Sequence, residues 1–246
     1  NYIRIRIWND PFNADGETYG GGGNDVSTGV EIAKEAAQYD MKVLLDFHYS
    51  DYWADPGQQN KPDAWKNLSF DELKEAVHKY TYDVLYRLKI MDCAPDMVQI
   101  GNEIRSGMLF PDGAVPQYRQ LAALVNEGIR AVRELLPETK VMIHLDQGGR
   151  YNCIMPWFDS MFNAGMLPID AIGLSFYSFW HGTFMDLKDT MSRLIKLYNL
   201  PVYIVETAHP WRHCHGEPLA SGGMSASYAP YFIGNHSALC DKKKSR

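Results

Sequence analysis

Six short segments of apolar and β-branched residues recur along the chain, and this recurrence constrains the fold more than any other feature of the sequence. Helical patterns separate most of these segments, and several segments end in polar or charged side chains. Strands that alternate with helices are typical of a parallel α/β fold, in which the carboxyl ends of the strands face the ligand. The six predicted strands are residues 2–8, 41–48, 97–103, 140–146, 170–177 and 201–207.

Within the parallel α/β class, the pattern favours a TIM (β/α)8 barrel. A dinucleotide-binding sheet would carry a glycine fingerprint, and this chain has none. A closed barrel needs eight strands, whereas six are recognisable, and residues 231–233 are too short to make another. If residues 2–8 are the second strand of the barrel, the first and eighth strands are absent, and these two are neighbours. We therefore expect an incomplete barrel with one slot, bounded by the strand of Arg6 and the strand of Glu206.

The segment MVQIGNE at residues 97–103 ends a buried type of strand in a carboxylate with an amide beside it. A charge on the body of such a strand would lie in the core at a desolvation cost, whereas at its carboxyl end it faces the mouth of the barrel. For an isolated Asn-Glu pair, a solvated loop acid would be the better interpretation. Glu206 ends its own apolar run in the same way, so we interpret Glu103 and Glu206 as a catalytic pair.

Polar side chains at the other strand ends would surround such a pair. Two arginines share one face of the first predicted strand: Arg6 would point into the mouth, and Arg4 would need a partner deeper in the barrel. The alternative places both arginines on a solvated face of an edge strand. A lone histidine is more often a hydrogen-bonded core group than a catalyst. That interpretation is weakened here because two predicted strands end in His or Asp. The further polar residues at strand ends are Asp46, His48, His144 and Asp146.

The loop at residues 49–65 combines aromatic rings with carboxylates and amides. This mixture suits stacking on sugar rings and hydrogen bonding to hydroxyl groups, with Asp51 among the candidate contacts. The loop lacks the regular acidic spacing of an EF-hand. For each tryptophan, packing in the core is an alternative that is nearly as well supported. The candidates for sugar stacking are Trp8, Trp53, Trp65 and Trp180.

Composition excludes several classes of function. The net charge is −6, and the only basic cluster is the terminal run at residues 242–246, which argues against nucleic acid as the main partner. No segment has the apolar length of a membrane span, and no signal peptide is present. The four cysteines are scattered, without a CxxC pair. The glycine run at residues 20–23 lacks the lysine and the spacing of a phosphate-binding loop.

Helix starts are predicted at two serines. Ser27 precedes a helical pattern, and Ser69 with Glu72 forms a capping-box signature for a helix that runs to about Leu88. A further helix of about twenty residues is expected to end at Leu136, before a proline, and another spans residues 187–200.

Several motifs, in this order along the chain, make the sequence similar to one family. They are IRIRIWNDP, VLLDFHYSDYWADP, QIGNEIRSGMLFP, MIHLD, GLSFY and VET. The sequence resembles glycoside hydrolase family 53, the endo-β-1,4-galactanases, which belong to a large clan of retaining hydrolases built on TIM barrels. The resemblance covers roughly residues 2–207. The first strand of the family and its eighth strand are not in this sequence, and residues 226–246 depart from the family pattern as a divergent tail. We expect residues 1–246 to form a single catalytic domain.

The resemblance implies a role for each strand-end residue. Glu103 would be the acid/base and Glu206 the nucleophile of a double displacement with retention, which independently requires two carboxylates about 5 Å apart. Asn102 would hold the 2-hydroxyl of the substrate. The residues expected around Glu206 are Arg6, His144 and Tyr177, and the expected substrate or supporting contacts are Asp46, His48, Asp51, Asp146, Trp8, Trp53 and Trp180.

The resemblance also bears on cofactors, partners and location. It implies a β-1,4-galactan substrate, no cofactor for the chemistry, a monomer, and an extracellular, cell-surface or periplasmic location. Bacterial relatives can carry a structural calcium ion, but no acidic cluster after Glu206 can be assigned to it, and Glu217 alone is not one. Two alternatives stay open. The chain could be a mannanase or cellulase of the same clan, or a truncated protein that binds galactan without cleaving it.

Overall fold

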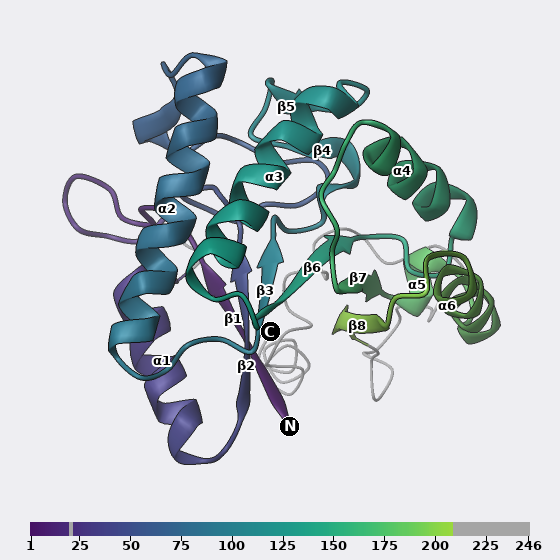
Figure 1. The fold of residues 1–246 in the computed structure, drawn as a ribbon, viewed down its shortest axis with the longest axis horizontal. Coiled ribbons are helices and arrows are strands. Elements are labelled where there is room, and N and C mark those ends of the chain that lie inside the picture. Colours follow the sequence, from purple (N-terminus) through teal and green to yellow (C-terminus); the bar gives the residue numbers. More distant parts are fainter. Residues whose placement is uncertain (20–21, 209–246) are drawn as a thin grey trace, which may run out of the picture.

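Six parallel strands form one sheet in the order of the chain, in a computed structural model that describes residues 1–19 and 22–208 (Figure 1). Every strand pairs in parallel with the next, as a barrel wall requires. All six predicted strands are confirmed, with ends that differ by at most three residues. The strands are β1 (Tyr2–Ile7), β2 (Lys42–Phe47), β3 (Met97–Ile100), β6 (Lys140–Leu145), β7 (Ala171–Phe176) and β8 (Val202–Thr207).

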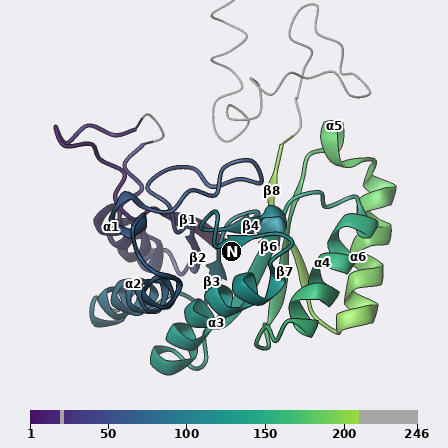
Figure 2. The ribbon, with the colours of Figure 1, turned by 90° about the horizontal axis from the view of Figure 1, so that it is seen from above.

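Helices connect the strands and cover one side of the curved sheet (Figure 2). Their apolar faces meet the outward side chains of the strands in a single hydrophobic cluster, to which β1 contributes Ile5 and Ile7. A short antiparallel hairpin, β4 (Gly107–Met108) and β5 (Gly113–Ala114), follows β3. The helices are α1 (Val26–Gln38), α2 (Phe70–Ile90), α3 (Tyr118–Leu135), α4 (Tyr151–Asn163), α5 (Ser178–His181) and α6 (Phe184–Tyr198), with 3-10 turns at Asp63–Trp65 and Ile104–Ser106.

The helix caps follow the sequence prediction in part. Ser69 and Glu72 form the predicted capping box at the start of α2. The prediction that Ser27 caps α1 is wrong: Asp25 caps it, because its carboxylate accepts hydrogen bonds from the backbone N–H groups of Ser27 and Thr28. The predicted helix at residues 187–200 begins earlier, at Phe184, where Thr183 caps it.

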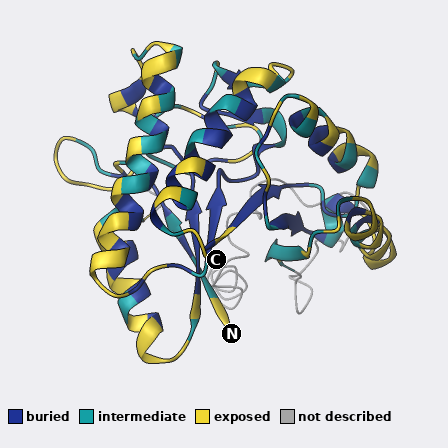
Figure 3. Cartoon of the chain, in the orientation of Figure 1, coloured by how far each residue is buried: buried dark blue, intermediate teal, exposed yellow. Residues whose placement is uncertain are grey.

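The opposite, concave face of the sheet is lined by alternate residues of each strand. Near the amino ends of the strands these side chains are apolar and form a small buried cluster of Leu44, Met97, Met142 and Ala171. Toward the carboxyl ends the same face becomes polar, although its residues stay buried. Figure 3 shows the central strands as the most buried part of the sheet. The chemistry-bearing side chains therefore lie on the concave face, above an apolar floor.

The wall of the barrel is incomplete. Within the described residues, β1 and β8 each have a single strand neighbour, so each presents one open edge. The central strands are almost fully buried, whereas all residues of β8 are half-buried or exposed. This partial TIM barrel agrees with the predicted slot between the strands of Arg6 and Glu206. Residues 226–246 and the segment 231–233 lie outside the described residues.

Candidate active site

Arg4 lies at the centre of the polar layer and links four strands. Its guanidinium donates to Glu206 Oε1 on β8 at 2.7 Å, and to Gln99 Oε1 on β3 at 3.1 Å. The same group contacts Asp46 Oδ2 on β2 at 2.8 Å and Asn102 Oδ1, just after β3, at 2.7 Å. Only 11% of the Arg4 side chain is exposed. The alternative of a solvated edge face is therefore excluded for Arg4, whose partners bring the two open edges of the sheet together.

A register shift turns Glu206 toward Arg4. Between Leu174 and Ser175 the pairing of β7 with β8 skips one residue, so Leu174 pairs with Ile204 but Ser175 pairs with Glu206. Ile204 packs with the outer core, and strict alternation would send Glu206 to the same side. Because of the bulge, Glu206 instead joins the concave face.

The surroundings of Glu206 favour its ionised form. Tyr177 donates its hydroxyl proton to Glu206 Oε2 at 3.1 Å, and Arg6 lies 3.9 Å from Oε1. Burial alone would raise the pKa of Glu206, but the Arg4 and Arg6 cations lower it to about 2. A buried carboxylate that stays charged at neutral pH and faces an open mouth is suited to act as a nucleophile.

Glu103 has the opposite electrostatic environment. It follows β3 in the left-handed helical conformation, with φ 49° and ψ 45°. Burial and the negative charge of Glu206 raise the pKa of Glu103 well above its usual range. Its carboxyl group contacts the hydroxyl of Ser175 on β7. A carboxyl group whose pKa is raised in this way is suited to act as a general acid.

The other predicted polar residues mostly bind protein groups. Burial would raise the pKa of Asp46, but Arg4 and His48 lower it to about 2. His48 Nε2 contacts Asp46 at 3.1 Å, and its Nδ1 accepts from the backbone of Ala54 at 3.0 Å. Asp46 and His48 are almost completely buried, so they support the site from beneath.

Two predicted acids tie the loops around the mouth. Asp146 accepts two hydrogen bonds from Arg105, at 2.7 and 3.1 Å, and Arg105 follows Glu103 by only two residues. Asp51 accepts from the backbone N–H groups of Asp10 and Asp63, at 2.9 and 2.8 Å. These acids therefore fix the loops that carry the site.

The tryptophan candidates separate by burial. Trp8 is fully buried, with its ring among those of His48, Tyr52 and Trp53, so it cannot stack on a sugar in this conformation. Trp65 is also buried in the core. Trp53 and Trp180 are half-buried near the mouth: Arg6 stacks over Trp53 at 4.5 Å, and Trp180 lies 5.7 Å from the ring of Tyr177. The stacking hypothesis is retained for Trp53 and Trp180.

Four site residues are absent from the candidates chosen by sequence. Arg4, Gln99 and Ser175 belong to the concave face. Each lies two or four residues before a chosen candidate in its own segment, namely Arg6, Glu103 and Tyr177, and this alternation is the signal that could have found them. Arg105 carried no such signal, because it acts from a 3-10 turn after β3.

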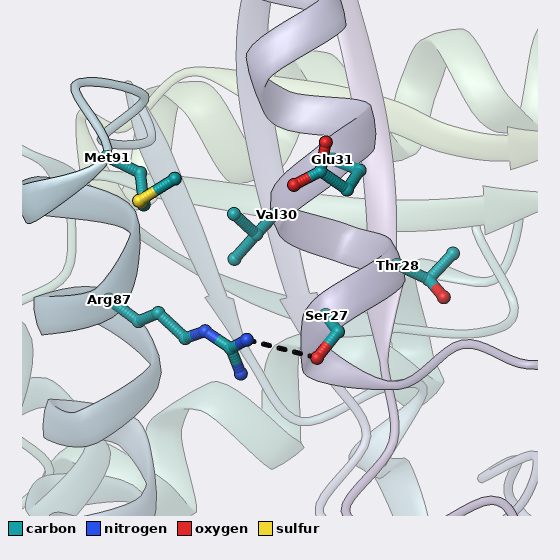
Figure 4. A pocket seen from close by; sticks show the side chains of 6 residues that line it. All are labelled: Ser27, Thr28, Val30, Glu31, Arg87 and Met91. Atoms are coloured by element: carbon teal, nitrogen blue, oxygen red, sulfur yellow. Dashed lines mark hydrogen bonds between the residues drawn. The ribbon is translucent and has the colours of Figure 1, made fainter.

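A pocket elsewhere on the molecule lies between α1 and α2 (Figure 4). Arg87 donates to Ser27 Oγ across it at 3.1 Å. None of its lining residues belongs to the polar layer. They are Ser27, Thr28, Val30, Glu31, Arg87 and Met91.

Residues 1–19 and 22–208 hold neither a grouped metal site nor a membrane-spanning helix. In that part of the chain, no three His, Cys, Asp or Glu side chains are grouped to hold a metal ion. No helix there has both the length and the apolarity that crossing a membrane requires.

The sequence profile of glycosyl hydrolase family 53 matches residues 1–231, which is most of the chain. The chain belongs to this family. Among family 53 relatives, an uncharacterized protein of Niallia circulans is 46% identical over 86% of this chain, and an endo-β-1,4-galactanase of Bacillus subtilis is 36% identical over 98%. The solved family 53 catalytic domain of Ignisphaera aggregans is 41% identical over 91% of this chain, with a TM-score of 0.83.

The family 53 chain described here is shorter than these relatives. It spans 57% of the Niallia circulans protein, 56% of the Bacillus subtilis galactanase and 62% of the Ignisphaera aggregans domain. Its open sheet edges at β1 and β8 are consistent with a partial match to a longer barrel.

Proposed function

We propose that this family 53 chain hydrolyses β-1,4-galactosidic bonds inside galactan, the side chains of pectin, by double displacement with retention. The observation that carries the proposal is that the pKa values of two carboxyl groups at the same end of the sheet are shifted in opposite directions. Glu206 has its pKa lowered to about 2, and Glu103 has its pKa raised. Such a split assigns a nucleophile and an acid to the same reaction.

The first step forms a glycosyl ester. The Glu206 carboxylate attacks the anomeric carbon, the bond from that carbon to the bridging oxygen breaks, and Glu103 gives its proton to that oxygen. In the second step the Glu103 carboxylate removes a proton from water, and the resulting hydroxide displaces Glu206. Tyr177 and Arg4 hold the Glu206 carboxylate in place during both steps.

Three residues near the acid pair are proposed to contact the substrate. The amide of Asn102 donates one hydrogen to the carbonyl of Ala54, at 2.8 Å, and its second hydrogen is directed to the 2-hydroxyl in this proposal. Trp53 and Trp180 would stack on sugar rings on either side of the cleaved bond. A polymeric substrate places the protein outside the cell or on its surface, and it acts there as a monomer without a cofactor for the chemistry.

The substrate is tested by measuring the release of reducing sugar from galactan, mannan and cellulose. We expect release from galactan at least about tenfold faster than from the other two polymers, since each misplaced hydroxyl leaves polar groups of the site unpaired. Faster release from mannan or cellulose would favour another hydrolase of the clan. Binding to galactan without release would favour the non-catalytic alternative.

Replacing Arg4 by lysine is expected to lower kcat/KM on galactan by about tenfold to a hundredfold. Lysine keeps the charge but cannot reach Glu206, Asp46 and Asn102 together, and each lost hydrogen bond to a charged group is worth about 1.5–3 kcal/mol. The pKa of Glu206 should rise, which moves the acid limb of the pH–rate profile to higher pH.

The matched control for Arg4→Lys is Arg6→Lys, on the same strand and face. Arg6 lies 3.9 Å from Glu206, so its replacement should leave the acid limb nearly in place. Equal shifts of the acid limb in both variants would contradict the central role of Arg4. Thermal unfolding of both proteins separates this effect from a loss of folding.

A further inference from the structure

A chain of hydrogen bonds runs from Glu103 into the protein through two buried side chains. The carboxyl group of Glu103 contacts Ser175 Oγ, which lies 2.9 Å from His144 Nε2. The other ring nitrogen, Nδ1, lies 2.9 Å from Asn102 Oδ1. Ser175 and His144 are both 0% exposed. Since solvent does not reach these two side chains, the hydrogens of the chain have to be assigned to its own atoms and their neighbours.

The orientation of the Asn102 amide is determined by its neighbours. Its nitrogen donates to the carbonyl oxygen of Ala54 at 2.8 Å, and its oxygen accepts from Arg4 Nη2 at 2.7 Å. A flipped amide would direct N–H groups at the guanidinium and an oxygen at a carbonyl oxygen. Asn102 Oδ1 is therefore an acceptor, and His144 Nδ1 must donate a hydrogen to it.

The distances around Nδ1 support this assignment. Two other nitrogens approach His144 Nδ1, namely Gln99 Nε2 at 3.2 Å and Arg4 Nη2 at 3.4 Å. Arg4 Nη2 donates to Asn102 Oδ1 at 2.7 Å and lies 2.8 Å from the Asp46 Oδ2 carboxylate oxygen, so both oxygens are closer to it than Nδ1 is. Both hydrogens of Gln99 Nε2 likewise have closer acceptors, Asp46 Oδ1 at 2.5 Å and the carbonyl oxygen of Gly101 at 2.9 Å. Both nitrogens therefore lie nearer to oxygen acceptors than to Nδ1, which agrees with a hydrogen on Nδ1 itself that is donated to Asn102 Oδ1.

The charge of His144 then sets the direction of the remaining bonds. Burial and the nearby Arg4 cation lower the pKa of His144 to about 3, so the ring is neutral at working pH. A neutral ring with its hydrogen on Nδ1 has a bare Nε2. Ser175 must donate its only hydroxyl hydrogen to that nitrogen, and its oxygen is left to accept a hydrogen from Glu103.

From this geometry we infer that Ser175, oriented by His144, is a positioning residue that holds the acidic proton on Glu103. This inference rests on the proposed function, in which Glu103 is the acid. When Glu103 gives its proton to the leaving oxygen, its carboxylate faces the lone pairs of Ser175, because the serine hydrogen is committed to His144. The same carboxylate regains a proton from water in the second step, so the chain of hydrogen bonds from Glu103 to His144 returns to its starting arrangement after each cycle.

Other charged groups also face Glu103, and they stay unchanged when Ser175 is replaced. Glu206 approaches from β8, Asp146 from the end of β6 and Asp55 from the loop after β2, and each disfavours a charge on Glu103. The remaining electrostatic neighbours are Arg4, Arg105 and Tyr177.

The proposed direction of the hydrogen bonds from Glu103 through Ser175 to His144, called the relay below, is tested by measuring the pKa of Glu103 directly. Proteins with ¹³C-labelled glutamate side chains are titrated by NMR, and the signal of Glu103 is assigned with Glu103→Gln. We expect Ser175→Ala to lower the pKa of Glu103 by about one unit, since an acceptor for the carboxylic proton is lost. Ser175→Thr keeps the hydroxyl group and should restore the original value. A rise or no change in Ser175→Ala would overturn the inference, because a serine that donates to the carboxylate has the opposite effect.

A second measurement tests the relay independently, and a control variant accompanies the titration of Glu103. In the unsubstituted protein, ¹⁵N NMR of His144 should show a hydrogen on Nδ1 and none on Nε2 between pH 5 and 8, and a hydrogen on Nε2 would overturn the relay. Thr81→Val removes another buried hydroxyl group, which bonds to Tyr49, and should leave the pKa of Glu103 unchanged.

The kinetic counterpart is the alkaline limb of kcat/KM. Glu103 must be protonated to act as the acid, so a lower pKa moves this limb to lower pH in Ser175→Ala and leaves the acid limb in place. Failure of the unsubstituted protein to release sugar from galactan would reject the proposed function. The two NMR measurements would still decide the relay, because they do not depend on activity.

Discussion

Glu206→Ala should abolish galactan hydrolysis, with kcat lower by at least about 10⁴-fold, as expected when the nucleophile of a covalent mechanism is removed. The alanine leaves space beside the anomeric carbon, while Glu103 keeps its proton-donating role. Azide, a small external nucleophile, should therefore restore turnover and give a glycosyl azide of inverted configuration. Reducing-sugar assays measure the loss, and NMR of the anomeric proton identifies the product.

The control for this experiment is Glu31→Ala, which removes an exposed acid on α1 whose partner is Lys34. This variant should keep full activity. Most of the activity surviving in Glu206→Ala, or an azide product of retained configuration, would contradict the nucleophile assignment. Thermal unfolding is needed alongside, because Arg4 loses one of its two carboxylate partners in the Glu206 variant.

Glu103→Ala should lower kcat on galactan by about 10²–10⁴-fold, because a sugar alkoxide is a poor leaving group unless it is protonated. The loss should be much smaller on an aryl β-galactoside with a dinitrophenyl leaving group, which departs without a proton. For that substrate the second step becomes limiting, and azide should accelerate it. Comparing the two substrates in steady-state kinetics separates an acid from a residue that only binds.

The comparison is completed by Glu103→Gln, which preserves the size of the side chain and retains a hydrogen-bond donor. It should lose activity on galactan to a similar extent, since an amide cannot deliver a proton. An equal loss on both substrates would count against Glu103 as the acid. Conversely, if Glu103→Ala were fully active on galactan, the mechanism would need another acid.

The order and type of the elements were largely readable from the chain. Each buried strand is a short apolar run, and the regular succession of strands and helices leaves a parallel arrangement as the natural outcome. The helix α4 was missed because Pro156 interrupts its apolar pattern. The cap of α1 was misplaced because Asp25 and Ser27 are both good capping residues, and only the backbone conformation distinguishes them.

The candidate site was predictable where a polar residue ended an apolar run. Glu103, Asn102 and Glu206 stood out for that reason. Arg4 and Ser175 did not, because they occupy mid-strand positions where an arginine suggests a solvated face and a serine suggests little. Trp8 shows the converse limit: its chemistry suits a sugar, but the rings of neighbouring residues cover it.

The sequence by itself determined which strands form and which two of them end in the paired carboxyl groups. The reason is that the hydrophobic pattern and the composition of each segment determine its own secondary structure. Only the tertiary structure decided how those groups differ. The bulge opposite Ser175 turns Glu206 onto the concave face, where Arg4 from the far edge of the sheet meets it. The carboxyl group of Glu103, which follows β3 in a left-handed conformation, lies against Ser175 instead. A pKa depends on burial and on charges brought from distant strands, so the pKa values of two strand-end glutamates shift in opposite directions.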